Sequence, residues 1–131
     1  MSEQVRREGG DSEWERTLGA ATAVAAGPLV LVGGTLPPAA GAAALGDTYE
    51  QTRSALADAV AALGPFGLAA EDVVRTRLYL AHGRDAEDAT RAHRELFAEV
   101  RPVCTVLVVG FPDSRVLVQV ELEAYRGGAD R

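Results

Sequence analysis

Two short apolar runs near the start of the chain are typical of buried strands. Residues 20–26 are small and apolar, and residues 29–32 are four aliphatic residues in succession. A Gly-Pro pair stands between the two runs and is a turn signal. Two glycines and then two prolines follow the second run and end it. This pattern predicts a β-hairpin over residues 20–32.

A helical repeat of apolar positions begins near residue 47. Asp47 and Glu50 are placed as in a capping box, in which each side chain satisfies a free backbone N–H at a helix start. The positions that then share one face recur every three or four residues, and they are Tyr49, Thr52, Leu56, Ala59, Val60 and Leu63. Gly64-Pro65 is a stop signal. We therefore predict a helix from residue 47 to residue 63 that packs on a sheet.

Residues 73–80 alternate with the period of a strand. One set of positions holds Val74, Thr76, Leu78 and Leu80, and the other holds Val73, Arg75, Arg77 and Tyr79. We predict that the first set lies in the core. The arginine face then needs water or a partner surface.

The rest of the chain predicts one more helix and two strands. Residues 85–100 carry an apolar stripe at helical spacing, and Pro102 forbids continuation of the helix. The stripe consists of Ala89, His93, Leu96, Phe97 and Val100. Residues 105–110 and 115–125 are rich in valine and leucine. Because the connection between them is short, we predict an antiparallel hairpin.

These elements give the order β-β-α-β-α-β-β and an α+β fold, with two helices on one face of a mixed sheet. At 131 residues the chain suits one domain, which we place at residues 13–127. Residues 1–12 are polar and without periodicity, so we predict a disordered N-terminal tail, and residues 128–131 form a C-terminal tail. The second sheet face is expected to expose a large apolar patch, which self-association would cover.

Composition excludes several classes of protein. The net charge is −6 and the arginines are scattered, so we expect no nucleic-acid partner. No apolar run reaches the roughly 18–20 residues that span a bilayer, and the first residues do not resemble a secretory signal, which predicts a cytoplasmic protein without a membrane partner. The single cysteine and the two histidines do not have zinc-site spacing, so we expect no metal and no cofactor.

Five segments in order resemble one known family. They are VGGTLP at 32–37, VVRTRLYL at 73–80, HRELF at 93–97, RPVCT at 101–105 and VELEA at 120–124. Together they resemble the reactive intermediate deaminase (RidA, YjgF-like) family over residues 14 to 126. The resemblance implies a chorismate-mutase-like fold and a homotrimer with small-molecule clefts between subunits. It also implies hydrolysis of the reactive enamines and imines that pyridoxal phosphate enzymes release.

The resemblance also implies a catalytic set, from which this chain departs. Family members carry an arginine just after the Pro-x pair, where its guanidinium holds the substrate carboxylate, and this chain has Cys104 there. The family glutamate that positions the attacking water aligns without gaps on Gln119, or on Glu121 if the last hairpin is two residues longer. Residues 119 and 121 share one sheet face in either case. We take Glu121, Gln119 and Cys104 as the candidate catalytic residues.

Four further residues are candidates for substrate binding. The resemblance places the backbone amide that helps to hold the ligand on Gly34, and the family's helix asparagine on Thr90. Trp14 and Glu15 match a Trp-Glu pair that a related branch without the arginine places near the cleft. Trp14 could equally be a hydrophobic plug that anchors the N-terminus.

Two functions therefore remain open. The chain is either an enzyme that hydrolyses, cyclises or dehydrates an imine, enamine or related carbonyl compound, or a non-catalytic module of the same fold that binds a metabolite or a partner enzyme. Cys104 is either a reactive thiol, a determinant of specificity, or a packed cysteine with no chemistry.

Overall fold

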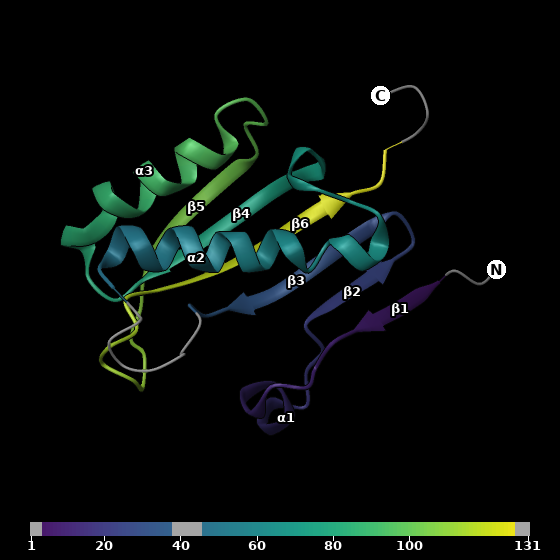
Figure 1. Cartoon of the computed structure of the whole chain (residues 1–131), viewed down its shortest axis with the longest axis horizontal. Helices are drawn as coiled ribbons and strands as arrows, with labels where there is room; N and C mark the ends of the chain where they lie inside the picture. Colours follow the sequence, from purple (N-terminus) through teal and green to yellow (C-terminus); the bar gives the residue numbers. More distant parts are fainter. Residues whose placement is uncertain (1–3, 38–45, 128–131) are drawn as a thin grey trace.

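Six strands form one mixed sheet in the computed structural model of the protein, which describes residues 4–37 and 46–127 (Figure 1). The strand order across the sheet is β1-β2-β3-β6-β4-β5, and every neighbouring pair is antiparallel except β4 with β5. The strands are β1 (Val5–Glu8), β2 (Ala23–Ala26), β3 (Leu29–Thr35), β4 (Val73–Leu80), β5 (Val103–Val108) and β6 (Val118–Tyr125).

Two long helices and one short helix accompany the sheet. They are α1 (Glu13–Leu18), α2 (Thr48–Ala61) and α3 (Ala86–Phe97), with short 3₁₀ turns at Gly64–Phe66, Ala70–Asp72 and Gly83–Asp85. Among the described residues, no helix is long and apolar enough to cross a membrane.

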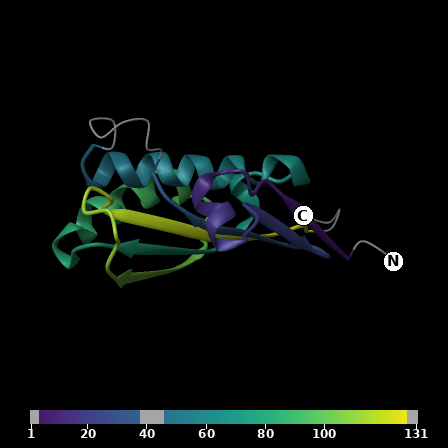
Figure 2. The same ribbon diagram turned by 90° about the horizontal axis from the view of Figure 1, so that it is seen from below.

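Helix α2 begins where the sequence predicts. Asp47 is its N-cap, and the Asp47 side chain accepts a hydrogen bond from the backbone N–H of Glu50 at 2.9 Å. The Glu50 carboxylate binds Arg53 at 2.8 Å instead of making the reciprocal hydrogen bond of a capping box. Helix α2 lies along one face of the sheet (Figures 1 and 2).

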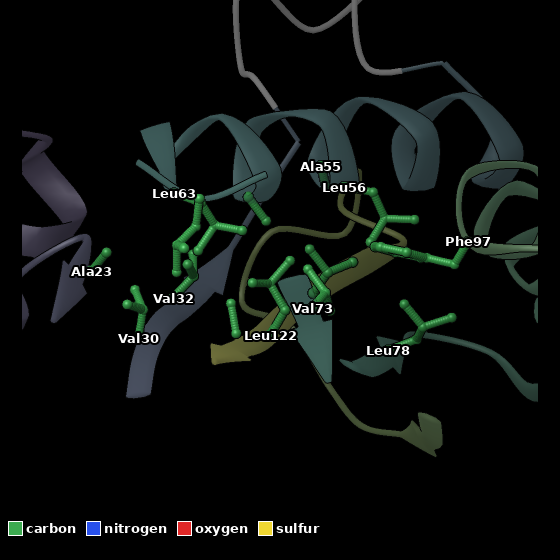
Figure 3. Packing of buried hydrophobic residues seen from close by; sticks show 14 of the residues in the cluster. Ala23, Val30, Val32, Ala55, Leu56, Leu63, Val73, Leu78, Phe97 and Leu122 are labelled. Atoms are coloured by element: carbon green, nitrogen blue, oxygen red, sulfur yellow. The ribbon is translucent and has the colours of Figure 1, made fainter. Parts of the chain in front are cut away.

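The core lies between the sheet and this helical layer. Leu56 of α2 and Phe97 of α3 are fully buried above Leu78 of β4 (Figure 3). Burying such a side chain contributes about 1.5–3 kcal/mol. The predicted stripe on α3 is wrong at Leu96, which is 39% exposed while Ala92 is buried in its place.

Strand β4 has the predicted bounds and one local change of face. Thr76, Leu78 and Leu80 are buried as predicted, but Val74 is 46% exposed and Val73 is buried. The cause is a β-bulge, because the pairing of β4 with β6 shifts between Val73 and Arg75.

The predicted hairpin of the last two strands is wrong. Strand β6 lies between β3 and β4, and β5 lies at the sheet edge, parallel to β4. The chain passes over the end of β4: Val109 N–H donates to the carbonyl of Leu80 at 2.8 Å, and Ala81 N–H donates to the carbonyl of Leu117 at 3.0 Å. The connection is therefore a crossover.

The N-terminus also differs from the predicted tail. Residues 5–8 form β1, which pairs with β2, and Arg6 stacks its guanidinium on Phe66 and donates to the carbonyl of Pro65 at 2.9 Å. Backbone hydrogen bonds hold β1 in place, so its sequence needs no hydrophobic periodicity and shows none that would predict a strand. The predicted C-terminal tail at 128–131 lies outside the described residues.

The centre of the uncovered sheet face is charged, which corrects the expectation of an apolar patch. Arg77 donates to Glu121 at 2.8 Å, and the side chains of Arg75 and Arg77 each lie 3.6 Å from Glu123. The apolar exposure is concentrated on the edge instead, since every residue of β5 is exposed. An apolar edge strand invites association with another chain.

His93 is a packed histidine of the helical layer. Its Nε2 lies 2.7 Å from Oγ1 of Thr76, and its ring lies 4.8 Å from that of Phe97. Burial lowers the pKa of His93 from its ordinary 6.5. The imidazole is therefore kept neutral by the fold.

Acidification should weaken the fold through His93. Because the folded-state pKa of His93 lies below 6.5, the unfolded chain binds the proton more readily than the folded chain. The contribution of neutral His93 to the free energy of unfolding is therefore complete above pH 6.5, and it is lost as the pH falls toward the lowered pKa. We expect the urea midpoint to fall between pH 7.5 and 5.5 in the native protein, and to fall less in His93→Gln. His82→Gln, outside the core, is the control. An identical pH dependence in His93→Gln would contradict the assignment.

Candidate functional site

Two adjoining cavities open where β3 ends. The first has a volume of about 380 Å³ and is lined by residues of α1 and β3, among them Trp14, Glu15 and Gly34. The second has a volume of about 440 Å³, and its lining includes Tyr79 and Gln119. Trp14, which is 45% exposed, and Leu36 line both. Each cavity has the size of a typical small-ligand site.

Gln119 lies directly against the backbone of Gly34. A Cβ atom at position 34 would lie only 2.4 Å from Nε2 of Gln119 and 2.9 Å from its Cδ. The pairing of β3 with β6 is irregular between Val32 and Thr35, which brings the two residues together. The absence of a side chain at position 34 therefore leaves the space that the Gln119 amide occupies.

Tyr79 is the register partner of Gln119 across β4 and β6. Its hydroxyl donates to Oε1 of Glu121 at 2.6 Å, and Arg77 donates to Oε2 of the same carboxylate at 2.8 Å. The hydrogen bond to Glu121 raises the pKa of Tyr79 and that of Arg77 above their usual values. Glu121 is thus engaged at both oxygens, and it does not itself line the second cavity.

Glu15 holds α1 in place. Its carboxylate accepts from Oγ1 of Thr22 at 2.7 Å and from the N–H of Ser12 at 3.3 Å, while Oγ of Ser12 accepts from the N–H of Glu15 at 3.1 Å. Burial acts to raise the pKa of Glu15, but these hydrogen bonds outweigh it and the pKa is lowered. These hydrogen bonds position Trp14 over the cavities, so Glu15 affects the site by holding Trp14 in place.

Cys104 and Thr90 lie away from both cavities. Cys104 is exposed on β5 opposite Thr76, and Thr90 is half-buried on α3 with its hydroxyl donating to the carbonyl of Glu87 at 3.1 Å. Strand spacings put Cys104 on the order of 14 Å from Gln119 of the same chain. One chain therefore gathers Trp14, Glu15, Gly34 and Gln119, and leaves Cys104 and Thr90 on another side.

The profile of the family described as Endoribonuclease L-PSP matches residues 20–126. The chain belongs to this family. It is 55% identical to the uncharacterized protein SCO2049 of Streptomyces coelicolor, over 98% of each chain. It is also 34% identical to Rv2704 of Mycobacterium tuberculosis, a member of the YjgF/YER057c/UK114 family, with a TM-score of 0.83 over 93% of this chain and 99% of that one.

The comparison with the yjgF gene product of Escherichia coli shows the shared fold alone. The two chains are 21% identical, with a TM-score of 0.70 over 82% of this chain and 87% of that chain. The predicted resemblance to the YjgF-like family is confirmed, together with the predicted α+β class and mixed sheet.

Sequence reasoning missed Tyr79 as part of the site of this YjgF-family chain. Its place beside Gln119 depends on β6 pairing with β4, and the predicted hairpin with β5 hid that neighbour. Leu36 and Phe111, which line the second cavity, carried no signal of their own. In the described part of the chain, no three His, Cys, Asp or Glu side chains are grouped so that they could hold a metal ion.

Proposed function

We propose that this protein binds a small uncharged imine in the second cavity and hydrolyses it to a carbonyl compound and ammonia. The observation that carries the proposal is the amide of Gln119, which lies against Gly34 at the polar end of a largely apolar cavity of about 440 Å³. The apolar wall includes Trp14, Leu36 and Phe111. Such a cavity suits a ligand with an apolar body and one polar group.

The cavity favours substrates without a carboxylate. Among the described residues that line it there is no arginine or lysine, and its one carboxylate, Asp113, is bound to Arg115 at 2.7 Å. The position from which the family resemblance expects a carboxylate-binding arginine carries Cys104, whose thiol offers no fork of charged donors. Gln119 can donate through Nε2 and accept through Oε1, which suits a neutral C=N or C=O group.

We further propose that a homotrimer completes the site. Cys104 lies on the order of 14 Å from Gln119 of its own chain, and in the proposed trimer a second copy supplies Cys104 and Thr90 to the same cleft. The apolar strand β5, whose residues are all exposed and which carries Cys104, supports this arrangement, because association would bury that edge.

A non-catalytic binding module is the second candidate. It is favoured by the state of Glu121, whose two carboxylate oxygens are already bound by Tyr79 and Arg77. In that case the cleft binds a metabolite or shields it, and no turnover follows.

The name of the matched family refers to an endoribonuclease, which this chain fits poorly. Its net charge of −6 opposes a polyanion, and no lysine or histidine is among the described residues that line the second cavity. We therefore do not propose RNA as its substrate.

The proposed hydrolysis is tested with two imines that differ in charge. The neutral probe is benzophenone imine, and the charged probe is the imine of L-phenylalanine, generated in the cuvette by an amino acid oxidase. We expect the protein to accelerate release of benzophenone and to act far less on the charged probe. Gln119→Ala should lower the rate about tenfold to a hundredfold, since a buried ligand group loses its hydrogen bonds.

Gln4→Ala, an exposed glutamine outside the cavity, is the control and should behave as the native protein. Thermal stabilisation by benzophenone without any turnover would support the binding module instead. Neither turnover nor stabilisation would contradict both functions.

A further inference from the structure

Tyr79 stands between Glu121 and the second cavity. Tyr79 is among the residues that line the cavity, and Glu121 is not. The two side chains are joined by the 2.6 Å hydrogen bond between the Tyr79 hydroxyl and Oε1 of Glu121. Within the chain, Tyr79 therefore connects this carboxylate to the wall of the cavity.

The direction of that hydrogen bond follows from Arg77. Arg77 donates to Oε2 of Glu121 at 2.8 Å and lies 3.6 Å from Glu123, and the oxygens of a carboxylate paired with a guanidinium accept hydrogen bonds. The Tyr79 hydroxyl must then be the donor. Its oxygen retains lone pairs, which can accept a hydrogen bond from a water molecule or an N–H group in the cavity.

Gln119 is the second polar group, beside Tyr79, at the polar end of the second cavity. Tyr79 and Gln119 are directly opposed on antiparallel strands, where the Cβ atoms of a pair lie about 4.5–5.5 Å apart. On its other side the amide of Gln119 lies against Gly34, where a Cβ atom would displace it. A water molecule bound between the phenol and the amide would have an acceptor and a donor, while the rest of the wall is apolar.

We propose that Tyr79 is a catalytic residue that binds the attacking water and passes its proton to Glu121. This step rests on the imine hydrolysis proposed above. The bound imine first takes a proton from solvent on its nitrogen. The water oxygen then forms a bond to the carbon of this protonated imine, and the C=N π pair moves to nitrogen. One proton of the water goes to the Tyr79 oxygen as the Tyr79 proton goes to Glu121, which leaves a neutral carbinolamine.

The proton then returns along the same path. Glu121 gives its proton to Tyr79 and Tyr79 gives one to the amine nitrogen, after which the C–N bond breaks with its electron pair on nitrogen. The carbinolamine hydroxyl becomes the new carbonyl, and its proton goes to the departing ammonia. The products are the ketone and ammonium, and both residues regain their starting state.

Tyr79→Phe is the deciding variant because it keeps the ring and removes the oxygen. We expect kcat/KM for benzophenone imine to fall about a hundredfold to a thousandfold, as for the loss of a general acid–base group. The Kd for benzophenone should change less than threefold and the melting temperature should stay within a few degrees, which separates this role from a structural one. Tyr125→Phe, an exposed tyrosine at the end of β6, should match the native protein.

A second variant tests the path itself. Glu121→Gln should lower kcat/KM to a similar extent, and the double variant should be little slower than either single one, since both residues serve one proton path. A native rate in Tyr79→Phe would overturn the role of Tyr79 alone. No acceleration by the native protein on either imine would remove the proposed function, and the role of Tyr79 with it.

Discussion

Gly34→Ala should disable the site while leaving the fold intact. The new Cβ would lie 2.4 Å from Nε2 of Gln119, so the amide must move away from its place in the cavity. The displaced atoms are the free end of a flexible side chain, and the backbone of Gly34 is not in the left-handed region, so the fold absorbs the change. We expect the rate with benzophenone imine to fall about tenfold to a hundredfold, as in Gln119→Ala, with a stability change within about 1 kcal/mol.

Gly33→Ala is the matched control for this variant. A Cβ at position 33 would have its nearest neighbour at 3.7 Å, which is an ordinary contact. It should therefore keep the native rate. Rates are measured by benzophenone release, and stability by urea unfolding. Equal rates in Gly33→Ala and Gly34→Ala would show that the position of the Gln119 amide does not matter.

Leu107→Asp should break the protein into single chains and remove its activity. Leu107 lies on the edge strand β5 and is 37% exposed in one chain. If β5 is buried between copies, the new carboxylate loses its water without a partner, which costs roughly 3 kcal/mol or more and weakens association more than a hundredfold. Sedimentation velocity should then report one chain instead of three.

Leu96→Asp is the control for this experiment. Leu96 is the same residue type with nearly the same exposure, 39%, but it lies on α3, where it lines a hollow with Leu56 and Val60 of α2. It should retain the assembly and the rate. A native protein that sediments as one chain, or an unchanged assembly in Leu107→Asp, would contradict the role of β5.

The fold could be predicted from sequence wherever the signal is local. The alternation over residues 73–80 gave the bounds of β4, and Asp47 gave the start of α2, because each depends only on neighbouring residues. The placement of β5 could not be predicted in this way. A valine-rich strand carries no mark of which neighbour it pairs with, so a hairpin and a crossover fit the same pattern.

The candidate site also has some residues that the sequence predicted and others that depend on long-range strand pairing. Gly34, Gln119 and Trp14, predicted from the family resemblance, lie together in the structure. Glu121 shares the predicted sheet face, but its engagement by Arg77 depends on the pairing of β4 with β6. Tyr79 was missed for the same reason. Residues that depend on long-range strand pairing lie beyond local sequence reasoning.

A crystal structure of the protein with benzophenone tests the proposed site most directly. We expect the ketone oxygen about 3 Å from the amide of Gln119 or the hydroxyl of Tyr79, with the rings against Trp14 and Phe111. Cys104 of a neighbouring copy should form the far wall of the same cleft. A ketone bound elsewhere, or a cavity beside Gln119 that no second copy approaches, would contradict a small-molecule site shared between subunits.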